Sequence, residues 1–258
     1  MQNITVASKP RLRSFVAAAL WLLGIANVKA AEVTVSGAAS LTNAFKEAAG
    51  AFEAQNPGTK VLLNFAASDA LLAQIAKGAP VDVFAAADQE SMDKAEQQGL
   101  LAPGSRRNFV ANSMVVIAPS DSTVRLETLA DLQQDAVKKV TLGNPAGVPI
   151  GRYAKGALEA ARLWTAVEPK AVYGTSVRQS LDYVARGEAD AGFVYATDAL
   201  VMKDKVKVAF TVPTETPVLY PVAIPKDGPN PADGRKFVDF LQSAPGQAIL
   251  ARYGFRKP

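Results

Sequence analysis

Two serine residues, Ser40 and Ser68, stand where an apolar strand-like run ends in Ala-Ala-Ser and a helical pattern begins. A Gly/Pro-rich stretch at 145–151 precedes a third helical pattern, and Thr175 with Ser176 precedes a fourth. The first turn of a helix presents backbone N–H groups without partners and the positive end of the peptide dipole. Hydroxyls and amides gathered at such helix starts can bind an anion without help from a cation.

Helix capping is the structural alternative for these serines, because a serine oxygen at a helix start often accepts a first-turn N–H bond. Capping accounts for Ser40 or Ser68 taken singly. Four such junctions in one chain favour a ligand site, because helices of open parallel sheets begin at the carboxyl edge, where ligands bind. The small Ala and Gly residues at the junctions would let an anion approach the backbone.

The chain between these junctions alternates β-rich runs with helical runs, which predicts mostly parallel sheets covered by helices on both sides. The predicted strands are 33–37, 61–65, 81–86, 114–118, 140–143, 171–174, 192–196, 206–211 and 218–224. The predicted helices are 41–55, 69–77, 90–98, 126–134, 152–164, 177–186, 231–242 and 246–252.

Two pairs of similar segments indicate two lobes of related build. The segments 75–88 and 184–198 each read as a helix end with a cation, a Gly, an Asp, an apolar strand and a second Asp. The segments 113–120 and 218–226 are apolar strands that end in Pro and a polar loop, as expected for strands that cross between lobes. Any αβ unit can resemble another in this way, which is the alternative explanation of the first pair.

The predicted fold is therefore α/β with two lobes, each a mostly parallel sheet flanked by helices, joined by two crossover strands. We expect residues 31–111 together with 220–258 to form lobe 1, and residues 112–219 to form lobe 2.

Composition excludes several kinds of chemistry. The chain has 258 residues but no Cys and no His, so disulfides, thiolate nucleophiles, imidazole bases and Ser-His-Asp triads cannot form. A secreted hydrolase built from Ser–Lys or carboxylate pairs is the main alternative from another class. Ser113, Lys155, Asp82 and Asp88 do not have the spacing of any such motif.

The first thirty residues read as a secretory signal. Lys9, Arg11 and Arg13 precede the apolar run 15-FVAAALWLLGIA-26, and small residues follow up to Ala30. We expect cleavage after Ala30; an uncleaved anchor helix is the alternative, although the apolar run is short for a membrane span. Residues 1–30 hold four of the 28 Lys and Arg and none of the 24 Asp and Glu. The mature chain is therefore balanced in charge, and nucleic-acid binding is not indicated.

The chain resembles the periplasmic molybdate-binding protein of an ABC importer from about residue 33 to its C-terminus. The segments that carry the resemblance are GAASLTNAF, FAASDALLAQIAKGAPVDVFAAAD, NSMVVIAPS, LGNPAGVPIGRYAKGAL, ADAGFVYATDA, YPVAIPK and GQAILARYGF. The resemblance implies a Venus-flytrap fold, typical of periplasmic binding proteins, with a tetrahedral oxyanion in the cleft between the lobes.

The resemblance also implies five ligand positions. They are the Ser40 and Ser68 hydroxyls in one lobe, and the Ile150 amide, the Val177 amide and the Tyr195 hydroxyl in the other. None is a direct metal ligand, because molybdenum would be bound as molybdate, and no cofactor is expected. Binding would bridge the lobes and favour their closed arrangement.

Two positions depart from the family pattern. The family usually has a small residue where Ile150 stands, which a backbone donor tolerates if the side chain points away. The serine that follows FAAS in the family is replaced by Asp69, either a first-turn acid or an acceptor for the proton of a protonated phosphate. We expect Arg152 to face solvent or pair with a nearby acid rather than bind the anion.

These inferences predict an exported, monomeric, non-enzymatic binding protein of the periplasm with molybdate or tungstate as ligand. Sulfate or phosphate is the alternative ligand, and donors alone would disfavour a protonated anion. The resemblance implies a membrane permease and its cytoplasmic ATPase as partners.

Overall fold

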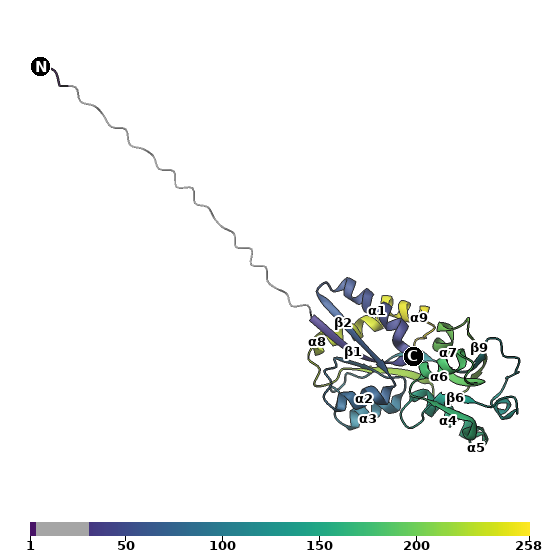
Figure 1. Ribbon diagram of the computed structural model, residues 1–258. Helices are drawn as coiled ribbons and strands as arrows, with labels where there is room; N and C mark the ends of the chain where they lie inside the picture. Colours follow the sequence, from purple (N-terminus) through teal and green to yellow (C-terminus); the bar gives the residue numbers. More distant parts are fainter. Residues whose placement is uncertain (4–30) are drawn as a thin grey trace.

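The computed structural model describes residues 1–3 and 31–258 (Figure 1). Most of the predicted signal, including its apolar run and its last residue Ala30, lies outside the described residues. Within the part described, no helix is both long and apolar enough to cross a membrane.

The described residues form two sheets. The first has the strand order β2-β1-β3-β10-β4 and the second has the order β7-β6-β8-β5-β9. The strands of the first sheet are β1 (Ala31–Ala38), β2 (Thr59–Ala66), β3 (Val83–Ala85), β4 (Arg107–Asn112) and β10 (Val218–Ala223). Those of the second are β5 (Met114–Pro119), β6 (Val140–Gly143), β7 (Ala171–Gly174), β8 (Ala191–Tyr195) and β9 (Val206–Val212).

Each sheet contains one reversed strand, and this strand marks where the chain changes sheets. In the first sheet β10 is antiparallel to β3 and β4, and in the second β5 is antiparallel to β8 and β9. The other strands of each sheet run in one direction. The chain passes from β4 to β5 through the single residue Ser113, and it returns from β9 to β10 through 213–217.

Helices cover both faces of the sheets, which confirms the predicted α/β class and its two-lobed build (Figure 1). Around the first sheet lie α1 (Thr42–Gln55), α2 (Ser68–Ala76), α3 (Gln89–Gln97), α8 (Pro231–Gln242) and α9 (Ala244–Arg252). Around the second lie α4 (Pro149–Ala160), α5 (Trp164–Val167), α6 (Val177–Ala185) and α7 (Ala196–Val201). We call the first sheet with its helices the first half, and the second sheet with its helices the second half.

The helix α1 shows how the sequence pattern determines packing in the first half. Its buried residues recur at helical spacing, and among them Phe45 and Phe52 face Phe237 of α8 with ring centroids 6.0 and 5.3 Å apart. The C-terminal helix α8 therefore packs on α1 of the first half.

Several elements of the structure differ from the prediction. The strand β4 was not predicted, because its apolar residues Phe109 and Val110 are adjacent and do not alternate. The predicted helix 126–134 is only a 3-10 helix over Leu129–Gln133, which buries Leu132 and begins with a Thr128–Asp131 capping box. The six-residue helix α7 was also missed, because its pattern is too short to stand out.

Two glycines set the position of α4 against β6. A Cβ atom on Gly151 would lie 1.9 Å from the carbonyl oxygen of Gly143, so the helix can approach the strand this closely only with glycine there. We expect Gly151→Ala to lower the free energy of unfolding by about 1–3 kcal/mol through overpacking. Gly156→Ala on the same helix is the control, because nothing lies within 4 Å of its added Cβ.

Urea unfolding of both variants checks this prediction. The control should gain up to about 1 kcal/mol from helix propensity. A Gly151→Ala protein as stable as the parent would contradict the close approach of α4 to β6.

Candidate functional site

A small cavity of about 10 Å³ lies between the two halves, and the five residues predicted as ligand positions all line it. The lining residues are Ala38, Ala39, Ser40, Ala66, Ala67, Ser68, Ala87, Val148, Pro149, Ile150, Val177 and Tyr195. Among the described residues, none of those lining the cavity is charged. The walls therefore offer small apolar side chains, hydroxyls and backbone.

Parallel pairing places the two serines side by side. Strands β1 and β2 are in register with Ala38 opposite Ala66, and each serine follows two residues after its alanine. Ser40 lies in the 3-10 turn Ala39–Leu41 before α1, and Ser68 is the first residue of α2.

Neither serine caps its helix, so the capping alternative is wrong for both. The N-cap of α1 is Leu41 and that of α2 is Ala67, and neither helix has a side-chain cap bond. The Ser68 hydroxyl accepts a hydrogen bond from the Ala87 amide at 3.0 Å, which leaves its own hydrogen available as a donor. At the fourth junction, by contrast, Ser176 does cap α6 by accepting from the Gln179 amide.

A relay of polar groups orients the Ser40 hydroxyl. The Asn112 side-chain amide lies 3.3 Å from the Tyr220 hydroxyl, which in turn lies 2.9 Å from the Ser40 Oγ atom. The Ser113 backbone amide donates to Asn112 Oδ1, so Asn112 Nδ2 must be the donor in this chain. Tyr220 can then donate to Ser40, which leaves the Ser40 hydrogen available as a donor. Sequence reasoning did not single out Asn112 or Tyr220, because only the crossover geometry brings them to Ser40.

Two backbone amides of the second half face the cavity from helix starts. Ile150 is the second residue of α4 and Val177 is the first of α6. Within residues 31–258 neither amide donates a hydrogen bond. The Ile150 side chain is buried and packs toward β6, where a Cβ on Gly143 would lie 3.1 Å from Ile150 Cγ2. The size of the Ile150 side chain therefore does not prevent the Ile150 backbone amide from donating to a ligand.

Tyr195 ends β8 and reaches the other half. Its hydroxyl donates to the Ala87 carbonyl at 3.3 Å. Burial raises the pKa of Tyr195 well above its ordinary value, so the hydroxyl stays protonated and acts as a donor at neutral pH.

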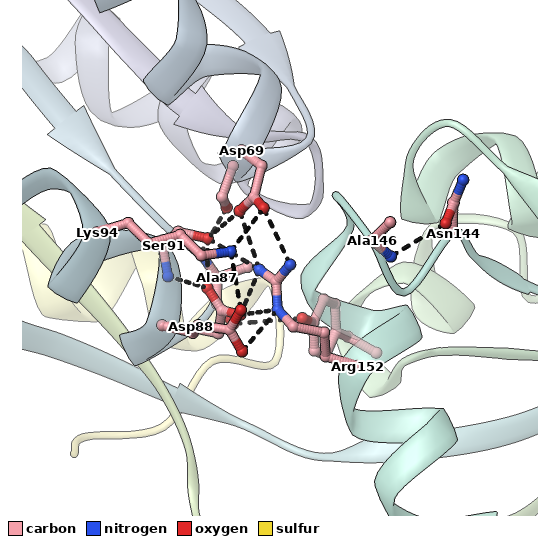
Figure 2. Close-up of polar contacts among 11 residues, drawn as sticks. Asp69, Ala87, Asp88, Ser91, Lys94, Asn144, Ala146 and Arg152 are labelled. Atoms are coloured by element: carbon pink, nitrogen blue, oxygen red, sulfur yellow. Dashed lines mark hydrogen bonds and ion pairs between the residues drawn. The ribbon is translucent and has the colours of Figure 1, made fainter. Parts of the chain in front are cut away.

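Asp69 faces away from the cavity, which argues against its proposed role as a phosphate acceptor. Its Oδ1 atom receives hydrogen bonds from Ser91 and Arg152, and its Oδ2 atom receives them from Lys94 and Arg152 (Figure 2). Burial opposes ionisation of Asp69, but these hydrogen bonds outweigh it and lower its pKa. Of the two expectations for Arg152, pairing with acids is correct and facing solvent is wrong.

Arg178 follows Val177 and lies behind the cavity wall. Its Nε atom donates to Asp198 at 2.5 Å, and its NH1 group donates to Asn43 across the halves at 2.9 Å. Asp198 is fully buried, and its Oδ2 atom has no hydrogen bond partner among the described residues. Burial raises the pKa of Asp198 to about 6, although Arg178 acts in the opposite direction.

The fold and this cavity define a two-lobed binding protein, and the comparisons agree. The family model "Bacterial extracellular solute-binding protein" matches residues 33–256, and the chain belongs to that family. It is therefore a solute-binding protein and not an enzyme.

Within the family its relatives include proteins named for molybdate. The molybdate-binding protein ModA of Haemophilus influenzae is 38% identical over 237 residues, covering 90% of this chain and 93% of that protein. ModA of Escherichia coli is 38% identical over 253 residues, covering 95% and 97%. The solved periplasmic molybdate-binding protein of Azotobacter vinelandii superposes with a TM-score of 0.76 at 26% identity, covering 88% of this chain and 99% of that one.

The raised pKa of Asp198 predicts a pH-dependent stability. Between the unfolded value near 4 and the folded value of about 6, the folded protein binds more protons than the unfolded chain. The free energy of unfolding should therefore fall as pH rises through this window, by on the order of 3 kcal/mol from this group.

Urea unfolding of the parent and Asp198→Asn between pH 4.5 and 7 tests this sign. The difference between the two proteins removes the effect of other titrating groups, and it should change across the window. If the free energy of unfolding changed with pH in the same way in both proteins, the raised pKa of Asp198 would be contradicted.

Proposed function

We propose that this protein captures molybdate, or tungstate, in the cavity and delivers it to an ABC-type importer. The observation that supports this most is the convergence of five uncharged donors from both halves on one cavity without a charged lining residue. The names of the relatives at 38% identity support molybdate as the ligand.

In this proposal the oxyanion receives hydrogen bonds from each wall. Ser40 and Ser68 donate from the first half, and Ile150 and Val177 donate from the second. Tyr195 also donates from the second half, by turning its one hydroxyl hydrogen from the Ala87 carbonyl to the ion. Each hydrogen bond to a charged group contributes about 1.5–3 kcal/mol. The helix dipoles of α2, α4 and α6 also direct their positive ends toward the anion.

A donor-only lining also provides selectivity. A fully deprotonated dianion can accept from every donor, whereas a protonated phosphate carries a hydrogen that needs an acceptor. An unsatisfied polar group of this kind costs about 1–3 kcal/mol. Selection of molybdate over sulfate must rest on cavity size, because both ions are tetrahedral dianions.

The organisation of the protein follows from this role. We propose lobe 1 as residues 31–111 with 220–258 and lobe 2 as residues 112–219, close to the points where the chain changes sheets. We further propose a monomer, exported to the periplasm by a leader cleaved after Ala30, that neither uses a cofactor nor binds nucleic acid. Its partners would be a membrane permease and the permease's cytoplasmic ATPase.

Thermal melts with molybdate, tungstate, sulfate and phosphate at equal concentration test the ligand. A ligand that binds only the folded state adds about 4 kcal/mol at a thousandfold excess over Kd. We expect large increases in Tm with molybdate and tungstate, and small ones with sulfate and phosphate. A larger increase in Tm with sulfate than with molybdate would identify sulfate as the ligand instead.

Serine substitutions test the site. We expect Ser40→Ala and Ser68→Ala each to weaken molybdate binding by about 1–3 kcal/mol, or roughly ten- to hundredfold. Isothermal titration measures the affinity. Ser105→Ala is the control, because this buried serine hydrogen-bonds with Ile224 away from the cavity. Unchanged affinity in both cavity variants would remove those hydroxyls from the site.

A further inference from the structure

An arginine from the second half is held by carboxylates of the first half (Figure 2). Arg152, on α4, donates to Asp69 on α2 at 3.0 and 3.1 Å and to Asp88, the N-cap of α3, at 2.6 and 2.9 Å. Glu90 lies 3.4 Å from the Arg152 Nε atom. The guanidinium therefore contacts acids on two different elements of the opposite half.

This cluster differs from the other ion pairs of residues 31–258. Among those pairs, the Arg152 contacts alone join the two halves, while the rest connect residues within one half. Arg178 also reaches across, but its carboxylate partner Asp198 lies in its own half and its contacts across are to uncharged groups.

The cluster is partly withdrawn from water. The side chain of Arg152 is 14% exposed, and those of Asp69 and Asp88 are 18% and 6% exposed. The Ser91 hydroxyl lies 2.7 Å from an Asp69 oxygen and 2.6 Å from an Asp88 oxygen, so the two carboxylates are held close together within the first half. Without Arg152 the only cation beside these acids is Lys94, 3.2 Å from Asp69, among the ion pairs of the described residues, and closing a second surface over Asp88 would be unfavourable.

The cluster is adjacent to the cavity but does not line it. Arg152 follows Ile150 by two residues, and Asp69 directly follows Ser68. The ion pair therefore connects the start of α4 to the start of α2, and each of these helix ends carries a candidate ligand donor, on opposite walls.

We propose that Arg152 is a positioning residue whose ion pairs with Asp69 and Asp88 hold the two halves closed and so set the oxyanion affinity without contacting the ion. This inference rests on the proposed function. The apparent affinity of a ligand scales with the fraction of protein in the binding-competent form. A contact made only when the halves are closed raises that fraction and slows release of the ion.

The test compares Arg152→Gln with Arg106→Gln. Both variants lose one positive charge, but Arg106 pairs with Asp93 and Glu96 within the first half. Stopped-flow and equilibrium titration with molybdate give the association and dissociation rates and Kd. We expect Arg152→Gln to raise Kd by about tenfold or more, mainly through faster dissociation, and Arg106→Gln to change it by less than about twofold.

A double-mutant cycle assigns the effect to the ion pair. Asp69→Asn should raise Kd less than Arg152→Gln does, because Asp88 still holds the arginine. In the double variant Kd should rise by less than the product of the two single increases, because both substitutions remove the same ion pair. Arg152→Lys keeps the charge but loses the planar fork, so it should restore only part of the affinity. Melting of the ligand-free variants checks folding; if Arg152→Gln does not fold, Asp69→Asn and Arg152→Lys carry the test.

The outcomes separate this inference from the proposed function. Absence of molybdate binding by the parent protein would overturn the proposed function. A parent that binds molybdate while the Arg152 variants keep its dissociation rate would overturn the closure role alone. Equal slowing of association in the Arg152 and Arg106 variants would also overturn it, because long-range attraction of the anion would then explain the effect.

Discussion

The cost of taking a dianion out of water is the constraint on which the site depends. Each charge that leaves water must be met by donors, and helix N-termini supply amides that have no partner within the helix. The register of Ala38 opposite Ala66 sets two such junctions side by side, and α4 and α6 bring two more from the other sheet. Small alanines along the walls leave the backbone open to the ion.

The division of charge follows from the same constraint. A lysine or arginine in the cavity would attract any anion, whereas directed dipoles and hydroxyls also test its shape and protonation. Arg152 and Arg178, which follow the lining residues Ile150 and Val177 closely in the sequence, do not line the cavity and pair with acids. Their charge is used to connect elements that carry the donors, while the lining itself stays uncharged.

Local patterns predicted much of this fold, and long-range contacts account for what they missed. The strands 140–143 and 171–174 and the helix 231–242 lie at their predicted bounds, because period and flanking residues determine them. The five candidate residues share one cavity, but the residue that orients Ser40 is Tyr220, 180 positions away. The capping interpretation failed because a local rule cannot show which distant group a hydroxyl meets.

Asp69 and Arg152 show how a departure from a family pattern can be interpreted. The sequence offered two interpretations of Asp69, a first-turn acid at the helix dipole or an acceptor for the proton of a phosphate. In the structure, Arg152 of the other half neutralises Asp69 through both carboxylate oxygens. The acid therefore adds a contact between the halves, and its charge is paired with Arg152 and Lys94 rather than directed into the cavity.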